Sequence, residues 1–484
     1  MYMKKILVSL LCMLIVFVTL YSCANDDVDN QAGSDNLDNK NTVKETEDPI
    51  KAAMEKMPVI NYNGREFNFF IPDCVPTHRD VITEAFTGEV LNDAKYSRFL
   101  TVENKYNIKI KQNYFGEPWE TYNNINKNVM ADDTPFDLVY LVDNNAQVLA
   151  AGLVLDLYKL EYPNFDNPWW NKSYIDELAV KNVLLMCPSS INLLFSSAIC
   201  FNKQMIEDFN METPYALVKS NDWIIDKLFE MALTVTSDLN GDGVMDINDR
   251  YGFSSQNSWF LSGVLHAGGY RVLVKNENGL PELNKDYGHL VKLIEKSMKL
   301  FTQDNVAFMY GNMINDKHPI PMNSGRVFAL YCHLSEVALL RDSDVDYGIV
   351  PYPKLDKDQK NYTGILWGPF YGISINAPDP EMSGLIFEAL CAESYYSVQP
   401  VFREQHLSAK FARDDEAIEM LEIIHNNILF EMARYYYTLS PYTGIVAQMY
   451  QSKSTDVMSY IAKNEDKMQS ALDDIIASYD AYVK

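Results

Sequence analysis

The residues best suited to chemistry lie in one loop, which starts at Asp238 and spaces oxygen-bearing side chains as calcium-binding loops do. Oxygen ligands fall at positions 1, 3, 5, 9 and 12 of the stretch 238–249, and Gly243 stands at position 6. Calcium takes about six to eight oxygens, and a sharp turn at a glycine can bring them onto one ion. We therefore predict a Ca²⁺ site formed by Asp238, Asn240, Asp242, the Val244 carbonyl and Asp249.

The same loop has a second interpretation that needs no metal. Asp and Asn side chains bind their own backbone two residues on, so the stretch also suits an Asx-rich turn between a helix and a strand. Asp249 stands where such calcium loops carry a longer Glu, which would weaken the site or change its geometry. We do not expect the protein to act as a calcium sensor, and we expect it to bind no catalytic cofactor.

Two polar side chains that could hold a solute follow the mainly apolar run 136–141. We predict this run to be a strand buried on both faces, and Asp143 and Asn144 come directly after it. Loops at the carboxyl ends of strands face the ligand crevice in open α/β sheets, and these side chains pair with hydroxyl groups. As ordinary caps of the helix predicted over 146–151 they would look the same.

The chain lacks the residue patterns of common enzyme classes. Its seven histidines are scattered without the two-His helical spacing of a zinc site, and we find no Gly-Xaa-Ser-Xaa-Gly elbow and no glycine-rich phosphate loop. Paired carboxylates of a glycosidase stay an open alternative among 66 acidic residues, but abundance does not indicate them. A net charge of −25 without a basic patch argues against nucleic acid as a partner. We therefore expect that the protein is not an enzyme.

The elements that must position these residues alternate between strands and helices. Period-two runs at 59–62, 67–71 and 108–112 predict strands, and the stretches 93–105 and 120–130 predict helices. This βαβ repetition predicts parallel sheets. The alternation continues with strands at 183–186 and 193–201 and with helices at 203–210, 223–233, 384–393, 415–428 and 456–482.

The length of the chain bounds its domain organisation. Residues 23–58 are poor in large apolar side chains and predict a flexible acidic tether. The body that follows is too long for one hydrophobic core and predicts at least two α/β lobes. Five of the seven cysteines belong to that body without the close spacing of a zinc or redox motif, so disulfides are neither implied nor ruled out.

The N-terminus reads as a targeting segment. Lys4 and Lys5 precede the apolar run 6–20, which is shorter than a spanning helix, and Ser22 stands directly before Cys23. A small residue followed by Cys resembles the lipobox of bacterial lipoproteins, although Tyr21 is unusual there. This resemblance implies a signal peptide over 1–22, acylation of Cys23 and an extracytoplasmic, membrane-anchored protein. A signal anchor, or a secretory signal with an incidental Cys, is the alternative.

Several motifs together resemble family 1 extracellular solute-binding proteins. Phe136-Asp137-Leu138-Val139, followed by the stretch 150–157, is similar to the family's "strand, Gly, Leu-Asp-Leu" passage. Cys200-Phe201-Asn202-Lys203 resembles its "Tyr-Asn-Lys" strand end, and 346–355 its "Tyr-Gly-Val-Xaa-Pro-Xaa-Pro" segment. Trp223 stands near a helix start that is Trp-Thr-Trp-like in the family, with Ile in place of Thr. The order of the matches carries more weight than any one of them.

The resemblance implies an α/β, type II periplasmic-binding-protein-like clamp with two discontinuous lobes and a hinge. It places the first lobe at 59–187 plus 326–370 and the second at 188–325 plus 371–484, with hinge crossings near 186–190, 326–331 and 368–375. It implies ligand contact by Trp259, and Tyr331 and Trp367 at the predicted crossings are further candidates for the cleft. The calcium loop would lie in the second lobe, away from the hinge, so its ion would be structural. For Trp169 and Trp170 we favour a structural role.

The function that the resemblance implies is solute capture for an ABC importer. The expected partners are a small solute, in the first place a mono- or oligosaccharide, an ABC permease, and the membrane through the lipid anchor; the chain is expected to be a monomer. A surface glycan-binding or sensory module without transport is the first alternative, and a secreted glycoside hydrolase is the second. The identity of the solute is not readable from the sequence.

Overall fold

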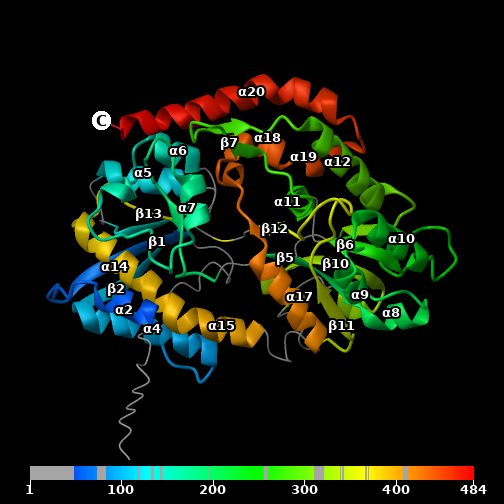
Figure 1. The fold of residues 1–484 in the computed structure, drawn as a ribbon, viewed down its shortest axis with the longest axis horizontal. Coiled ribbons are helices and arrows are strands. Elements are labelled where there is room, and N and C mark those ends of the chain that lie inside the picture. Colours follow the sequence, from blue (N-terminus) through cyan, green and yellow to red (C-terminus); the bar gives the residue numbers. More distant parts are fainter. Residues whose placement is uncertain are drawn as a thin grey trace, which may run out of the picture. The chain divides into compact units, whose positions relative to one another are not determined.

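The fold is that of a computed structural model, which describes residues 48–72, 83–117, 120–131, 136–141, 145–193, 196–255, 260–309, 321–337, 340, 343–365, 368, 370–406 and 413–483. From Asp48 on, the chain forms one compact unit (Figure 1). The predicted signal peptide, Cys23 and most of the predicted tether lie outside the described residues. The end of the predicted tether was wrong, because Pro49–Glu55 forms helix α2, whose Ile50, Ala53 and Met54 pack against the core.

The first sheet has the strand order β2-β1-β3-β13-β4. Strands β1, β2 and β3 are parallel, whereas β13 runs antiparallel between β3 and β4, pairing Phe370 with both Leu141 and Pro188. Strand β1 ends in a run of fully or nearly buried side chains, as expected for a strand covered on both faces. The bounds are β1 Arg65–Pro72, β2 Ile108–Phe115, β3 Leu138–Leu141, β4 Cys187–Pro188 and β13 Phe370–Ile373.

The second sheet has the order β11-β5-β10-β6-β9. Strand β10 is parallel to β6 and antiparallel to β5, and β5 is antiparallel to β11. Two short ribbons, β12 with β14 and β7 with β8, complete the strands of the described residues. The bounds are β5 Ser197–Asn202, β6 Tyr251–Ser255, β7 Leu273–Lys275, β8 Pro281–Leu283, β9 Ala307–Met309, β10 Val327–His333, β11 Tyr347–Val350, β12 Gly364–Ile365 and β14 Ile428–Leu429.

Helices cover both sheets. Those that pack with the first sheet or one another on its side are α4 Val90–Tyr106, α5 Thr121–Ala131, α6 Asn145–Ala150, α7 Lys172–Leu178, α14 Pro380–Glu393 and α15 Gln399–His406. The second sheet is accompanied by α8 Lys203–Asp208, α9 Pro214–Lys219, α10 Ile225–Val235, α11 Gly263–Ala267, α12 Tyr287–Thr302, α13 Leu334–Val337 and α17 Asp415–Asn426. We call each sheet with its helices the first and the second lobe.

The remaining helical segments include the short α2 Pro49–Glu55 and a C-terminal series. This series comprises η7 Met432–Tyr435, η8 Tyr437–Leu439, α18 Ser440–Thr443, α19 Ile445–Ser452, α20 Val457–Ser478 and η9 Tyr479–Ala481. Further short turns are η2 Leu157–Lys159, η3 Phe260–Ser262 and η4 Pro321–Ser324, and the π-helical segment η6 Ser394–Val398 joins α14 to α15. Among the described residues no helix is both long enough and apolar enough to cross a membrane.

Local chemistry explains where the longer helices begin and end. The side chains of Asp286, Asp379 and Asp456 cap the N-termini of α12, α14 and α20 by accepting backbone N–H groups. Helix α4 ends at Asn107, which adopts a left-handed conformation with φ 49° and donates its N–H to the Glu103 carbonyl. The ends of α4, α14 and α20 agree with the predicted helices to within a few residues, whereas α12 was not predicted.

Two predicted strands were wrong, because their backbone groups bond outside a sheet. In the stretch 59–62 the Tyr62 N–H donates to the Tyr106 carbonyl at the end of α4. In the stretch 183–186 the Leu184 N–H donates to the Asp156 carboxylate, and only Cys187 and Pro188 join the sheet as β4. An extended, apolar sequence pattern does not by itself say which partner its N–H groups find.

The connections between the lobes agree with the predicted crossings only in part. Strands β10 and β11, which fall in 326–370, pair inside the second sheet, and so no crossing occurs near 326–331. Strand β13 and helix α14, which fall in 371–484 apart from Phe370, belong to the first lobe. The chain passes between the lobes after β4, where a crossing was predicted near 186–190, and between β12 and β13, next to the crossing predicted near 368–375. A further passage, between α15 and α17, was not predicted. The lobe to which each strand belongs is set by strands with which it pairs, and these strands lie far away in the sequence.

The longest helix, α20, packs against elements of both lobes. It touches α12 and β8 beside the second sheet and α6 beside the first. In Figure 1 it extends over α12 at one end and over α6 at the other. Val457, Ile461, Met468 and Leu472 are buried along it, so the helix is held by an apolar stripe.

Candidate functional site

The carboxyl ends of the parallel strands define the edge at which a ligand crevice is expected in each lobe. In the first lobe these ends are Pro72, Phe115 and Leu141, and in the second lobe they are Ser255 of β6, Met309 of β9 and His333 of β10. The segments 73–82, 142–144, 256–259 and 310–320 that continue from four of these ends lie outside the described residues. The crevice can therefore be described from its strand ends.

The wall of the second lobe is rich in buried hydroxyl groups. Tyr331 of β10 lies in register beside Ser255 of β6, and both are almost fully buried. Ser196 precedes β5 and Ser262 ends η3, which leads into α11. Within the described part of the chain the hydroxyls of Ser196, Ser255 and Ser262 have no hydrogen-bond partner. Buried hydroxyls usually find one, so this wall offers donors and acceptors to whatever lies against it.

Tyr331, which we predicted as a cleft residue, is almost fully buried within β10, and its contact with a solute stays a prediction. Its ring packs edge-on against Tyr352 with centroids 5.3 Å apart, and burial raises the pKa of its phenol. The hydroxyl sits against Gly263, where a Cβ would come within 1.9 Å of the oxygen. A side chain at position 263 would push this phenol away. Helix α11 and strand β10 can therefore lie this close together only with a glycine at the first residue of α11.

A buried carboxyl ends the same strand. Glu336 in α13 accepts the N–H of His333 at 3.1 Å, and burial raises the pKa of Glu336 to about 7. Near neutral pH this group is therefore divided between its acid and its carboxylate. It can donate a hydrogen bond in one form and accept one in the other.

A cluster of titratable groups lies where η7 meets α11 and β7. Glu431 accepts N–H groups from Val272 at 2.5 Å and Ala433 at 2.9 Å, and complete burial raises its pKa to about 7. The His266 Nδ1 is 4.0 Å from the Glu431 carboxylate. Burial, with the positive charge of Arg434 and of Arg271, lowers the pKa of His266 to about 3. A neutral imidazole thus stands beside a carboxyl that changes charge near neutrality.

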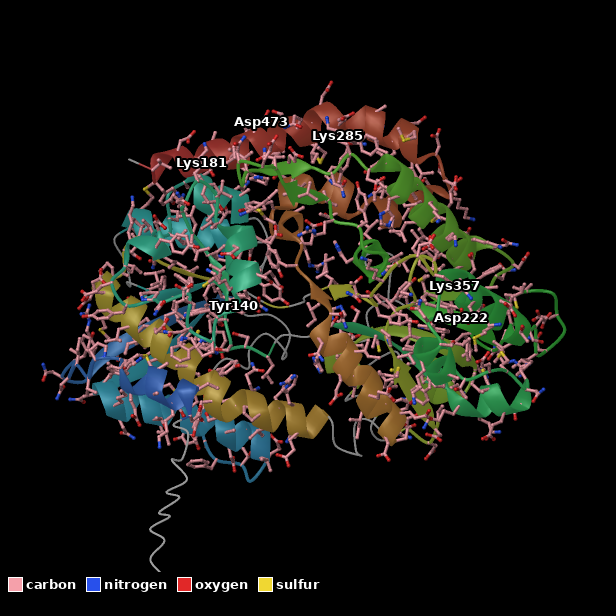
Figure 2. The ribbon with its side chains drawn as sticks, viewed as in Figure 1. Tyr140, Lys181, Asp222, Lys285, Lys357 and Asp473 are labelled. Carbon is pink, nitrogen blue, oxygen red and sulfur yellow. The ribbon has the colours of Figure 1, made fainter. Side chains whose placement is uncertain are left out.

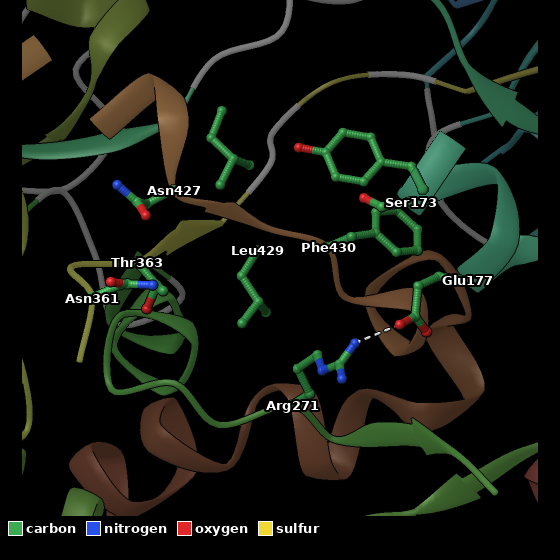
Figure 3. A pocket seen from close by; sticks show the side chains of 10 residues that line it. Ser173, Glu177, Arg271, Asn361, Thr363, Asn427, Leu429 and Phe430 are labelled. Carbon is green, nitrogen blue, oxygen red and sulfur yellow. Dashed lines mark hydrogen bonds and ion pairs between the residues drawn. The ribbon is translucent and has the colours of Figure 1, made fainter. Parts of the chain in front are cut away.

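A pocket of about 310 Å³ opens between the lobes next to this cluster (Figure 3). Helix α7 of the first lobe supplies one side of it, and Arg271 with the segment before β12 supplies the other. An ion pair of 2.7 Å joins Arg271 to Glu177 across it. The lining residues are Ser173, Tyr174, Glu177, Arg271, Asn361, Thr363, Asn427, Ile428, Leu429 and Phe430.

Aromatic rings pack tightly where the C-terminal segment meets the first lobe. Tyr435 of η7 stacks on Phe370 of β13 with centroids 3.8 Å apart, and Phe430 lies beside Tyr174 of α7 at 5.4 Å. In the first sheet Tyr140, labelled in Figure 2, meets Tyr371 edge-on. Sequence analysis missed Glu431, Arg434 and Tyr435. The aromatic run 435–437 inside an otherwise helical stretch was the signal that could have identified this segment.

Four of the five predicted ligand contacts are not placed by the structure. Asp143, Asn144, Trp259 and Trp367 lie outside the described residues and stay predictions. In the sequence, Asp143 and Asn144 come two and three residues after the end of β3, Trp259 comes four residues after the end of β6, and Trp367 stands between β12 and β13. Tyr331 is the member of the set that the structure describes.

Trp169 and Trp170 have the structural role that we favoured. Their indole N–H groups donate to the two oxygens of Glu388 in α14, at 2.9 and 2.7 Å, and both rings are nearly buried. Asn167 donates to the same carboxylate at 2.7 Å. These bonds tie the loop before α7 to the first lobe.

The predicted calcium loop lies between α10 and β6, in the second lobe. Asp238 accepts the N–H groups of Gly241 and Gly243 at 2.7 and 2.8 Å, so its oxygens face the inside of the loop. Asn240 accepts the Asp242 N–H, and Asp242 accepts the Val244 N–H. Each of these oxygens keeps a second lone pair that an ion can use. The first three predicted ligands thus gather on one loop.

Asp249 closes the loop by another route. Its two oxygens accept the N–H groups of Leu239 at 2.9 Å and Asp246 at 2.8 Å, which lower its pKa. Val244 is exposed at the tip. In the described ranges no group of three or more His, Cys, Asp or Glu side chains is arranged to hold a metal ion. These contacts also suit the Asx-rich turn, so the Ca²⁺ site stays a prediction.

Comparison with known proteins gives a match at the level of the fold. No family model matches the sequence, and no curated protein matches it. Among solved structures, a cyclo/maltodextrin-binding protein in complex with maltotetraose is similar, with a TM-score of 0.55 and 13% identity over 87% of this chain and 98% of that one.

Two further structures have the same fold. A sugar transporter protein from Rhizobium etli in an open conformation has a TM-score of 0.54 and 14% identity, over 86% of this chain and 99% of that one. An ABC substrate-binding protein from Listeria monocytogenes in complex with cycloalternan has a TM-score of 0.52 and 13% identity, also over 86% and 99%. The prediction of a type II, two-lobed α/β fold is confirmed.

Proposed function

We propose that this two-lobed protein is the extracytoplasmic solute-binding component of an ABC importer and that its solute is a carbohydrate. The observation that carries the proposal is the fold, which is shared over 86–87% of the chain with proteins whose structures hold maltotetraose and cycloalternan. Fold alone does not determine function. The chemistry of the strand ends is the second support.

The second-lobe wall suits a solute with many hydroxyl groups. Ser196, Ser255 and Ser262 offer hydroxyls without partners in the described ranges, and Tyr331 stands among them. Sugars combine such hydroxyls with flat C–H faces that stack on aromatic rings. In the proposed complex Trp259 and Trp367 supply the stacking surfaces, and Asp143 and Asn144 bind from the first lobe.

The mechanism is capture and release without chemistry. A solute that contacts both walls favours the arrangement in which both contacts are made, by its differential affinity for the two states. We propose that this form docks on a permease. Acylation at Cys23 and a tether that ends before Asp48 would keep the binding unit near that permease and raise its effective concentration. One acyl chain binds a membrane only marginally, so a diacylated Cys is the form expected.

Titration calorimetry with a panel of solutes tests this function. The panel contains maltotetraose and shorter glucans, monosaccharides, polyamines and peptides, and the products are analysed by chromatography after the titration. We expect stoichiometric binding of a sugar that is recovered unchanged. Release of shorter sugars would support a glycoside hydrolase instead, and failure of every sugar to bind, with binding of a peptide or polyamine, would overturn the carbohydrate assignment. Reconstitution with a permease then separates transport from surface binding or sensing.

A further inference from the structure

A short segment of the first lobe, residues 176–181, makes polar contacts both with the second lobe and with the C-terminal helix. We propose that these contacts form a latch that fixes the angle between the lobes. We call the segment, with its partners Arg271, Lys275 and Asp480, the polar latch. Only its effect on solute affinity rests on the proposed function, since the lobe angle exists without a solute.

The first half of the latch joins the end of α7 to β7, which belongs to the segment between α11 and α12 of the second lobe. Arg271 Nη1 lies 2.7 Å from Glu177 Oε1, and Lys275 Nζ donates to the Ala179 carbonyl at 2.6 Å and to the Asp176 carbonyl. The last carbonyls of a helix lack partners within the helix and carry its negative dipole end. Lys275 of the second lobe supplies the missing donor. The C-terminus of α7 in the first lobe is thus capped by a positive charge from the second lobe.

The second half joins the turn after α7 to the end of α20. Lys181 donates to the Ile476 carbonyl at 3.4 Å and forms an ion pair with Asp480. Nearby in the same lobe, Lys159 donates to the Tyr482 carbonyl at 2.6 Å. The first half of α20 is held on the second lobe, where Glu465 accepts from Tyr287 at 3.0 Å. Figure 2 labels Lys181 and Lys285 beneath different parts of α20.

The two halves of the latch lie at different distances from the first sheet's carboxyl edge. The Glu177–Arg271 pair lines the pocket between the lobes. Lys181 precedes Pro188, which is paired with Phe370 at the carboxyl edge of the sheet, by seven residues along the chain. A rotation that moves the crevice walls must therefore also change the distances across the latch.

The strength of the latch suits a contact that opens and closes. Glu177, Arg271 and Lys181 keep between 26% and 33% of their side-chain surface exposed, so water and salt screen their charges. Interactions between such charges weaken over about 10 Å at 0.1 M salt and over a shorter distance at higher salt. Several weak, screened contacts at one place can favour one angle between the lobes and still break when the lobes move.

The test measures the distance between the lobes in the full-length protein by single-molecule energy transfer. Dyes are placed through non-natural residues at Met130 on α5 and Leu233 on α10, both exposed, so that native thiols stay untouched. The latch variant combines Lys181→Met, Arg271→Met and Lys275→Met. We expect its distance distribution to broaden or its mean to shift relative to the wild type. Raising the salt from 0.05 to 1 M should move the wild type toward the variant and leave the variant unchanged.

A matched control removes the same number of positive charges from ion pairs inside the second lobe. It combines Lys227→Met, Lys292→Met and Lys296→Met, whose partners are Glu230, Asp356 and Asp226. We expect the wild-type distribution. A latch variant that matches the wild type at both salt concentrations, or a control that changes as much as the latch variant, overturns the proposal.

A charge exchange keeps the test decisive if the triple variant does not fold, as judged by circular dichroism. Glu177→Arg alone should alter the distribution, and Glu177→Arg with Arg271→Glu should restore it, because the exchanged pair can form again. With a sugar found by titration, the latch variant should also change Kd by at least threefold. If no sugar binds, the proposed function fails while the distance measurement still decides on the latch.

Discussion

At the scale of single residues, Glu431 combines complete burial with a position next to three other titratable groups. Its carboxylate accepts backbone N–H groups, but its negative charge faces a histidine that burial keeps neutral. Arg271 and Arg434 are the positive charges of this cluster. Burial raises the pKa of this carboxyl from its ordinary value of 4.5 to about 7.

This raised pKa predicts how stability depends on pH. Because the folded state binds the proton more tightly than the unfolded state, the carboxyl opposes folding increasingly as the pH rises from about 4.5 through 7. Between pH 5 and pH 8 the wild type should lose up to about 3 kcal/mol more unfolding free energy than Glu431→Gln. Urea unfolding at both pH values measures this, and equal losses in the two proteins would show that Glu431 does not titrate in this range.

Trp259 carries the prediction for solute binding. An indole that stacks on a sugar face loses both the contact and the exclusion of water when it is replaced by Ala. We expect Trp259→Ala to raise the Kd of the bound sugar at least tenfold, which is about 1.4 kcal/mol. Tyr158→Ala, which removes an exposed ring of the first lobe, is the control and should bind as the wild type does. An unchanged Kd in Trp259→Ala would place the stacking surface elsewhere.

Residue types indicated some roles well and others not at all. The paired tryptophans 169 and 170 after a proline-rich loop suggested an anchor, and both bind Glu388. Glu431 gave no sign in sequence, because its surroundings come from Val272 and His266, more than a hundred residues earlier in the chain. Tyr331 was predicted beside a hinge crossing, yet it stands inside β10.

At the scale of elements, the loop 238–249 holds its shape through its own side chains. Gly241 and Gly243 have φ values of 74° and 79°, which let the chain turn while Asp238 accepts both their N–H groups. Asp249 joins the two ends of the loop. An ion bound here would add to a preformed arrangement.

Calcium addition tests the metal prediction. We expect Ca²⁺ to raise the melting temperature, EDTA to reverse the effect, and Mg²⁺ to act less because it demands a stricter geometry. Asp238→Asn with Asp242→Asn should abolish the shift, whereas Asp358→Asn, in an exposed turn, should retain it. A melting temperature that calcium leaves unchanged would favour the Asx-rich turn that needs no metal.

Elements with strong periodicity and clear ends were predicted closely. Strand β2 and helices α4, α14 and α20 lie where the pattern indicated them, because capping residues and alternating apolar positions are local information. The assignment of strands to sheets was not local. Strand β10 pairs with β5, some 130 positions earlier, and only the folded chain shows that this pairing keeps 327–333 in the second lobe.

At the scale of the whole molecule, the order of motifs predicted the fold class although no family model matches the chain. Sequence order survives divergence that removes single motifs, which is why a two-lobed α/β architecture was predictable at about 13% identity. The crevice itself was less accessible, because its walls come from six or more strand ends that the sequence does not bring together. Solute identity depends on those walls.

The predicted membrane anchor is tested on the intact protein. We expect the wild type, expressed in a bacterium, to enter the detergent phase on Triton X-114 partitioning and to gain the mass of a diacylglycerol at its N-terminus. Cys23→Ser should move the protein to the aqueous phase with its sugar affinity unchanged, since the binding unit begins after the tether. Wild-type protein that stays in the aqueous phase would exclude acylation.

Strand β13 has a consequence for how the chain is made. It is inserted between β3 and β4, pairing Phe370 with Leu141 and with Pro188, although it is synthesised long after both. Until it emerges, each of these neighbours presents an unpaired edge, and the first lobe remains incomplete although all five strands of the second sheet have been synthesised. A nascent chain would then keep an unfinished first lobe for most of its synthesis, and fragments ending before Phe370 should aggregate.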